Sequence, residues 1–230
     1  MVADFDFVNW SNQTVANLGG DHGTQCCSSA AGRFDNDIGG SGLAANCHLI
    51  GARRGGAASV VDIVDGWIWA AGFTTGSTNP SFPAQLATGA DIISNSWGGG
   101  FTWSNTLKDG LDFLTVYGRG GKGCIVCFSV GNLGYTSFSA TRRMASYERT
   151  IAVGASINAN PTNPCNSLHA DPNGNTNNLP AVVDTRTYYN PYGPEMDIVA
   201  PSHTCYDPTL PGNMIRDPVM AAVRVDEGDW

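Results

Sequence analysis

Segments with strand character alternate along this chain with segments whose apolar residues recur at helical spacing. Strands are expected at residues 47–52, 91–94, 124–130, 150–155 and 196–200, and helices at 25–32, 59–71 and 107–117. Parallel strands need long crossover connections, which are usually helices. The alternation therefore predicts an α/β fold with a mainly parallel sheet and helices on both of its faces.

The two longer expected helices carry apolar residues at spacings that place them on one face. In the first these are Val60, Val61, Val64 and Ile68, and in the second Leu107, Leu111 and Leu114. Residues 158–180 are rich in Asn, Pro, Gly and Thr and are expected to form a loop.

Length and composition limit the class of protein. The chain has 230 residues, of which 42% are hydrophobic and 14% charged, as expected for one folded domain over residues 1–230. A net charge of -8 argues against nucleic acid or an anionic membrane surface as a partner. No apolar run approaches the roughly 20 residues that span a bilayer, so no membrane partner is expected.

The seven cysteines include Cys124 and Cys127, which form a C-x-x-C motif. No second pair stands at zinc-ligand spacing, and both lie in an apolar run that predicts a buried strand. Small core residues are the favoured interpretation, and a metal or redox pair is the alternative.

His22 is a candidate general base. It stands before Gly-Thr at an expected helix start, where an imidazole can project into a cleft with its backbone held by the helix. The alternative is a surface or capping histidine. Cys26 follows four residues later, one helical turn away on the same face, which predicts a thiol beside the imidazole.

Asn132 is a candidate oxyanion donor. Its Gly-Asn turn follows an apolar strand, and the carboxyl ends of strands in open parallel sheets are where active sites gather. A side-chain amide there can donate a hydrogen bond to a developing oxyanion, and one such donor contributes about 3 kcal/mol. The alternative is an ordinary turn asparagine.

Ser96, Trp97 and Gly98 are candidate substrate-binding residues. They leave an expected strand and precede further glycines, so an extended peptide could pair with their backbone. The alternative is a plain exit from strand to loop.

These residues belong to a series of motifs that resemble, in order, segments of the subtilisin-like serine peptidases (subtilases). The motifs are Asp-Phe-Val-Asn at 6–9, Asp-His-Gly-Thr at 21–24, a glycine-rich segment at 37–44, and residues 90–98, 130–132, 150–155 and 197–201. The resemblance implies a subtilisin-like fold and a serine endopeptidase acting on polypeptides through a Ser/His/Asp triad. His22 would be the base and Asn132 the oxyanion donor, and Ser96, Trp97 and Gly98 would hold the substrate backbone.

Three segments are most similar to the kexin-like branch of the family. They are Gln-Cys after the histidine motif, residues 94–98, and Gly-Arg-Gly-Gly-Lys-Gly at 118–123. Kexin-like enzymes use carboxylates to bind paired basic residues, and no acid stands in residues 53–56 or 133–136. Dibasic specificity is therefore not expected here.

The family's remaining catalytic motifs are missing from the sequence. No Gly-Thr-Ser motif occurs, and the family's catalytic aspartate precedes the segment that resembles residues 6–9. Asp4, Asp6 and Asp21 are the nearest carboxylates to His22, but side chains adjacent in sequence seldom face one another. We therefore expect a fold incomplete at both ends, with the serine and aspartate supplied from outside. A complementing chain or segment carrying the serine helix is the expected partner. The alternative is a degenerate, inactive subtilase fold that at most binds extended peptides.

The resemblance carries two further expectations. The chemistry requires no cofactor, but many subtilases bind calcium at the loop matching residues 34–40, where Asn36 and the carbonyls of Phe34, Ile38 and Gly40 offer oxygen ligands. Subtilases are usually exported, so a secreted or extracytoplasmic location is favoured.

Overall fold

The computed structural model describes residues 3–6, 21–37, 40–53, 58–75, 89–98, 103–132, 144–156, 190–202, 205–206 and 215–216. The chain divides into two compact units. Unit 1 comprises Met1–Ser96, Phe101–Val126 and Met220–Trp230, and unit 2 comprises Trp97–Gly100 and Cys127–Val219. A single domain over residues 1–230 stays a prediction.

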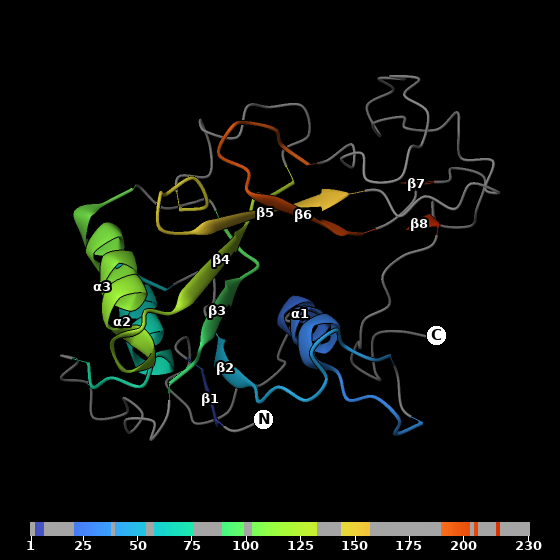
Figure 1. The fold of residues 1–230 in the computed structure, drawn as a ribbon, viewed down its shortest axis with the longest axis horizontal. Coiled ribbons are helices and arrows are strands. Elements are labelled where there is room, and N and C mark those ends of the chain that lie inside the picture. Colours follow the sequence, from blue (N-terminus) through green and yellow to red (C-terminus); the bar gives the residue numbers. More distant parts are fainter. Residues whose placement is uncertain are drawn as a thin grey trace. The chain divides into compact units, whose positions relative to one another are not determined.

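Helices and strands alternate through unit 1 (Figure 1). In chain order they are β1 (Ala3–Asp6), α1 (Asp21–Ala31), β2 (Ile50–Arg53), α2 (Val60–Ala70), β3 (Ile92–Asn95), α3 (Asn105–Gly121) and the first half of β4 (Ile125–Ser129). Unit 2 contains the rest of β4 with β5 (Ile151–Ser156), β6 (Ile198–Pro201), β7 (Cys205–Tyr206) and β8 (Ile215–Arg216).

The principal sheet has four strands in the order β3-β4-β5-β6. β5 is parallel to both of its neighbours, with Cys127 opposite Ile151 and Val153 opposite Ile198. β1 and β2 form a separate parallel pair, and the short strands β7 and β8 an antiparallel pair. The prediction of an α/β fold with a mainly parallel sheet is confirmed. The expected loop at 158–180 lies outside the described residues.

α2 and α3 pack against each other in unit 1 and bury the core of that unit (Figure 1). Leu107, Leu111 and Leu114 of α3 are all 0% exposed, which confirms the predicted face of this helix. At the contact, a Cβ on Gly110 would lie 3.0 Å from the methyl carbons of Val64, so a larger residue would require the Val64 side chain to shift.

The predicted face of α2 is confirmed only in part, since Val64 packs on α3 while Val60 and Ile68 are half-buried. Val61 is 58% exposed, whereas Ile63, Trp67 and Trp69 are buried at 4%, 5% and 2%. Indole rings bury far more apolar area than valine side chains, so the helix turns its tryptophans inward. Among the helices in the described part of the chain, none has the length and apolar character of a membrane-spanning segment.

Candidate active site

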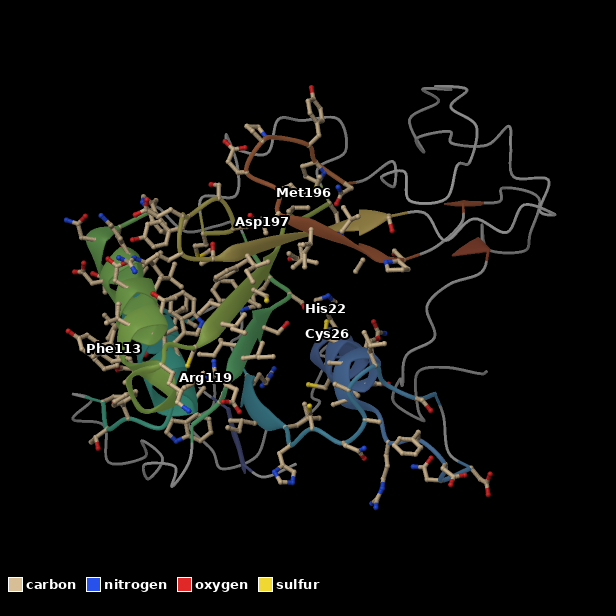
Figure 2. The ribbon with its side chains drawn as sticks, in the orientation of Figure 1. His22, Cys26, Phe113, Arg119, Met196 and Asp197 are labelled. Atoms are coloured by element: carbon tan, nitrogen blue, oxygen red, sulfur yellow. The ribbon has the colours of Figure 1, made fainter. Side chains whose placement is uncertain are left out.

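His22 lies in the first turn of α1, because this helix begins at Asp21 and not at the expected residue 25. Its side chain is exposed. The Sγ atom of Cys26 lies 3.8 Å from His22 Nε2, and Figure 2 shows the two side chains together on the helix. The helical spacing therefore predicted this pair correctly.

The opposite end of α1 is held by the loop that follows it. The backbone N–H groups of Gly42, Leu43 and Ala44 donate to the carbonyl oxygens of Gly32, Ser29 and Ala30. These bonds satisfy carbonyls that a helix end leaves without intrahelical partners. A Cβ on Gly42 would overlap the backbone nitrogen of Gly32, so glycine is needed at this contact.

Two of the three candidate carboxylates lie on a strand that the sequence analysis did not predict. β1 pairs with β2 so that Asp4 is opposite Gly51 and Asp6 opposite Arg53. The backbone of Asp21 begins α1. The side chains of Asp4, Asp6 and Asp21 lie outside the described residues, so their role as orienting groups stays untested.

Cys27 is the second thiol of α1, and its environment disfavours the thiolate. Burial raises the pKa of Cys27, and the neighbouring Cys26 raises it further. The thiolate is the nucleophilic form of cysteine. The raised pKa therefore disfavours Cys27 as a nucleophile.

The segment Ser96-Trp97-Gly98 begins where β3 ends. Asn95, the last residue of β3, is 3% exposed, and its Oδ1 accepts a hydrogen bond of 3.0 Å from Trp67 Nε1. Ser96 and Trp97 are half-buried and Gly98 is exposed. The buried and hydrogen-bonded side chain of Asn95 therefore lies immediately before the point where this segment leaves the sheet.

Trp97 makes an aromatic contact within unit 2. Its ring meets Phe128 of β4 edge to face, with the centroids 5.7 Å apart and the planes at 77°. Phe128 is 1% exposed. Such aromatic pairs contribute about 0.5–1.5 kcal/mol beyond the area that they bury.

Asn132 lies just beyond the carboxyl end of β4, and its side chain is exposed. Val130 before it is buried, and its N–H donates to the carbonyl of Val153 in β5. Gly131 has φ 87°, a left-handed conformation that glycine adopts without strain. The Gly-Asn turn predicted from the sequence is thus present at a strand end.

The predicted site residues are divided between the two units. Trp97, Gly98 and Asn132 belong to unit 2, where Trp97 packs on the strand that leads to Asn132. His22 and Ser96 belong to unit 1. Sequence reasoning missed the bond from Trp67 to Asn95, because nothing in the sequence links an indole to an amide 28 residues away.

The loop proposed for calcium is described in part. Residues 34–37 form bends, and Asp35 and Asp37 both have φ 56°. Ile38, one of the suggested carbonyl ligands, lies outside the described residues. Within the described ranges, no group of three or more His, Cys, Asp or Glu side chains is arranged to hold a metal ion.

The C-x-x-C motif lies at the start of β4. Cys124 is 5% exposed, and its thiol donates to the carbonyl of Ala90 at 3.1 Å. Burial raises the pKa of Cys124, although the nearby Arg119 opposes this, and burial also raises the pKa of Cys127. Cys124 is a core residue, as the favoured interpretation predicts.

Comparison with known proteins gives a consistent result. The model of the subtilase family matches residues 5–222. A calcium-dependent protease of Trichormus variabilis is 31% identical over 170 residues, which cover 67% of this chain and 23% of that protein. A thermophilic serine proteinase of a Bacillus species is 31% identical over 158 residues, covering 67% of this chain and 33% of that protein.

Solved structures share the fold. A protease of Pseudoalteromonas arctica superimposes with a TM-score of 0.57 at 24% identity, covering 80% of this chain and 44% of that one. Sphericase gives a TM-score of 0.54 at 19% identity, covering 95% of this chain and 63% of that one. The chain spans between 23% and 33% of the length of the two curated relatives.

Proposed function

This chain belongs to the subtilase family, and on that premise we propose that it is part of a serine endopeptidase that hydrolyses peptide bonds with a Ser/His/Asp triad. The observation that carries the proposal is the exposed imidazole of His22 in the first turn of α1, within the Asp-His-Gly-Thr motif. The names of the two relatives, a protease and a serine proteinase, agree with this activity.

The proposed mechanism assigns one task to each residue. His22 takes the proton from a serine hydroxyl as the serine oxygen attacks the substrate carbonyl, and later gives that proton to the leaving amine. The side-chain amide of Asn132 donates a hydrogen bond to the oxyanion that forms in between. The serine and the aspartate that orients His22 come from outside these 230 residues.

The substrate is an extended polypeptide that pairs with the backbone of Ser96, Trp97 and Gly98. The exposure of Gly98 and the half-buried state of Ser96 and Trp97 support this role, because backbone pairing needs an accessible strand. We place the protein in the kexin-like branch on the motifs at residues 25–26, 94–98 and 118–123, without its dibasic specificity.

A second candidate is an inactive subtilase fold that only binds extended peptides. The observation that favours it is the absence of Gly-Thr-Ser from the sequence. Without the nucleophile, such a triad loses nearly all of its rate advantage, because its members act as a unit.

The deciding experiment treats the purified chain with a fluorophosphonate probe and a casein substrate, followed by intact-mass analysis. We expect neither adduct nor cleavage from these 230 residues alone. A longer product of the same reading frame that contains Gly-Thr-Ser should form an adduct and cleave casein. The His22→Ala variant should abolish both, and Asn132→Ala should lower kcat about 100- to 1,000-fold. An adduct on a serine of this chain, or full activity of His22→Ala, would overturn the assignment.

Calcium, location and assembly complete the proposal. A structural calcium ion would bind the loop at residues 34–40, in line with the name of the calcium-dependent relative. Chelation should then lower the melting temperature, and an unchanged value would count against the site. The protein would be secreted or extracytoplasmic, as subtilases usually are, and a complementing segment would carry the serine helix.

A further inference from the structure

A buried hydrogen bond connects helix α2 to the end of strand β3. Trp67 Nε1 donates to Asn95 Oδ1 at 3.0 Å, and the two residues are 5% and 3% exposed. The very next residue, Ser96, begins the proposed peptide-binding segment Ser96–Gly98. The bond therefore acts at the point where the chain leaves the sheet.

The donor side of this bond is held rigidly. α2 begins at a capping box in which Ser59 Oγ accepts from the N–H of Asp62, while the Asp62 carboxylate accepts from the N–H of Ser59. Further along, the helix packs on α3 through the contact between Val64 and Gly110. Trp67 thus presents its N–H from a helix fixed at its start and along its side.

The direction of the hydrogen bond matters at its acceptor, the side-chain amide of Asn95. An amide oxygen accepts a hydrogen bond within a limited range of directions, whereas an apolar contact has no preferred direction. The bond to Trp67 therefore restricts the rotation of the Asn95 side chain and connects the last residue of β3 to α2. Ser96 follows directly, so the bond acts on the chain where the proposed peptide-binding segment begins.

We propose that Trp67 is a positioning residue for peptide binding, which acts through Asn95 to aim the backbone of Ser96–Gly98 at an extended polypeptide. Trp67 itself lies in the core and does not touch the peptide. This inference rests on the proposed function, because it assumes that Ser96–Gly98 binds a peptide backbone.

The test measures peptide affinity and stability separately, in a set of variants of the whole chain. The probe is fluorescein-labelled β-casein, an unfolded polypeptide, and its affinity is read from fluorescence anisotropy. Trp67→Phe keeps most of the ring and removes the N–H, and it should weaken casein binding about tenfold, within the range expected for a lost buried hydrogen bond. Circular dichroism and melting curves show whether each variant is folded.

A double variant separates positioning from stability. Trp67→Phe combined with Asn95→Leu removes the donor and the acceptor of this bond together, so neither is left facing a lost partner and the melting temperature should recover in part. Casein affinity should stay low, because the apolar pair no longer orients the segment. Phe113→Leu is the matched control: it weakens the edge-to-face contact of Phe113 in α3 with Phe73, a residue that follows α2, whose ring centroid lies 5.0 Å away, and it should leave casein affinity unchanged.

The outcomes distinguish the inference from the proposed function. Wild-type binding that Trp67→Phe leaves unchanged would overturn the positioning role alone. So would a double variant whose casein affinity recovers together with its stability, because that would make the bond merely structural. A folded wild-type chain that does not bind casein would remove the proposed peptide binding, and the positioning role with it.

Discussion

Asn190 gives the sharpest stability prediction in unit 2. It is 1% exposed, and its Oδ1 accepts from the N–H of Ala155 in β5 at 2.8 Å while its Nδ2 donates to the carbonyl of Pro191 at 2.9 Å. Asn190→Ala removes these two bonds and a weaker one from Nδ2 to Met196 Sδ at 3.5 Å. A polar group left unpaired in the interior costs about 1–3 kcal/mol, and Ala155 is partly accessible to water, so the total should be about 2–4 kcal/mol.

This cost should be visible in thermal unfolding. For a chain of this size, each kcal/mol lowers the melting temperature by about 2–4 °C, so Asn190→Ala should melt about 5–15 °C below the wild type. Differential scanning calorimetry measures the shift, and urea unfolding checks the free energy. A melting temperature within one degree of the wild type would refute the reasoning, because it would mean that water replaces both bonds without cost.

Asn190→Asp tests the donor separately, through its pH dependence. The variant keeps an oxygen facing the N–H of Ala155 but turns a second oxygen toward the carbonyl of Pro191. Burial and this repulsion should raise the pKa of the introduced carboxyl above its unfolded value. Stability relative to the wild type should then be present at low pH and be lost as the pH rises through the raised pKa. Equal stability of both proteins at every pH would contradict the assignment of the donor.

Two further predictions concern unit 1. Ser59→Ala removes the capping box with Asp62 and should cost about 1 kcal/mol, seen as a lower urea midpoint, whereas Ser59→Thr should retain most of the stability. In native protein at pH 8, iodoacetamide should alkylate the exposed Cys47 first and the buried Cys124 slowly, because burial raises the pKa of Cys124 and reduces its thiolate fraction despite the opposing charge of Arg119. Peptide mapping reads the order, and equal labelling rates would contradict it.

The sequence by itself determined the kind and order of most of the elements from β2 to β6. Strands and helices were predicted close to β3, β4, β5, α2 and α3, because hydrophobic periodicity is a local property that a window of residues already contains. The buried leucines of α3 and the pairing of His22 with Cys26 follow from the same helical geometry. The family motifs supplied the candidate roles of His22 and Asn132.

The sequence predicted the boundaries of elements and the local backbone conformation less well than the kinds of element. α1 begins four residues earlier than expected and therefore includes His22. The backbone of α3 leaves the helical conformation directly after the expected residue 117, at Gly118, Arg119 and Gly120. Arg119 is left-handed at φ 53°, and its guanidinium lies 2.8 Å from the Asp91 carboxylate. An ion pair between residues 28 apart in sequence leaves no local signal.

Only the tertiary structure decided which surfaces meet. It pairs β2 with β1, and β1 is a strand that no periodicity had indicated. It buries the tryptophans of α2 while Val61 stays exposed. It also joins Trp67 to Asn95 within unit 1, and Trp97 to Phe128 within unit 2. These contacts connect residues distant in sequence, and their geometry depends on how whole elements pack, which local residue patterns do not contain.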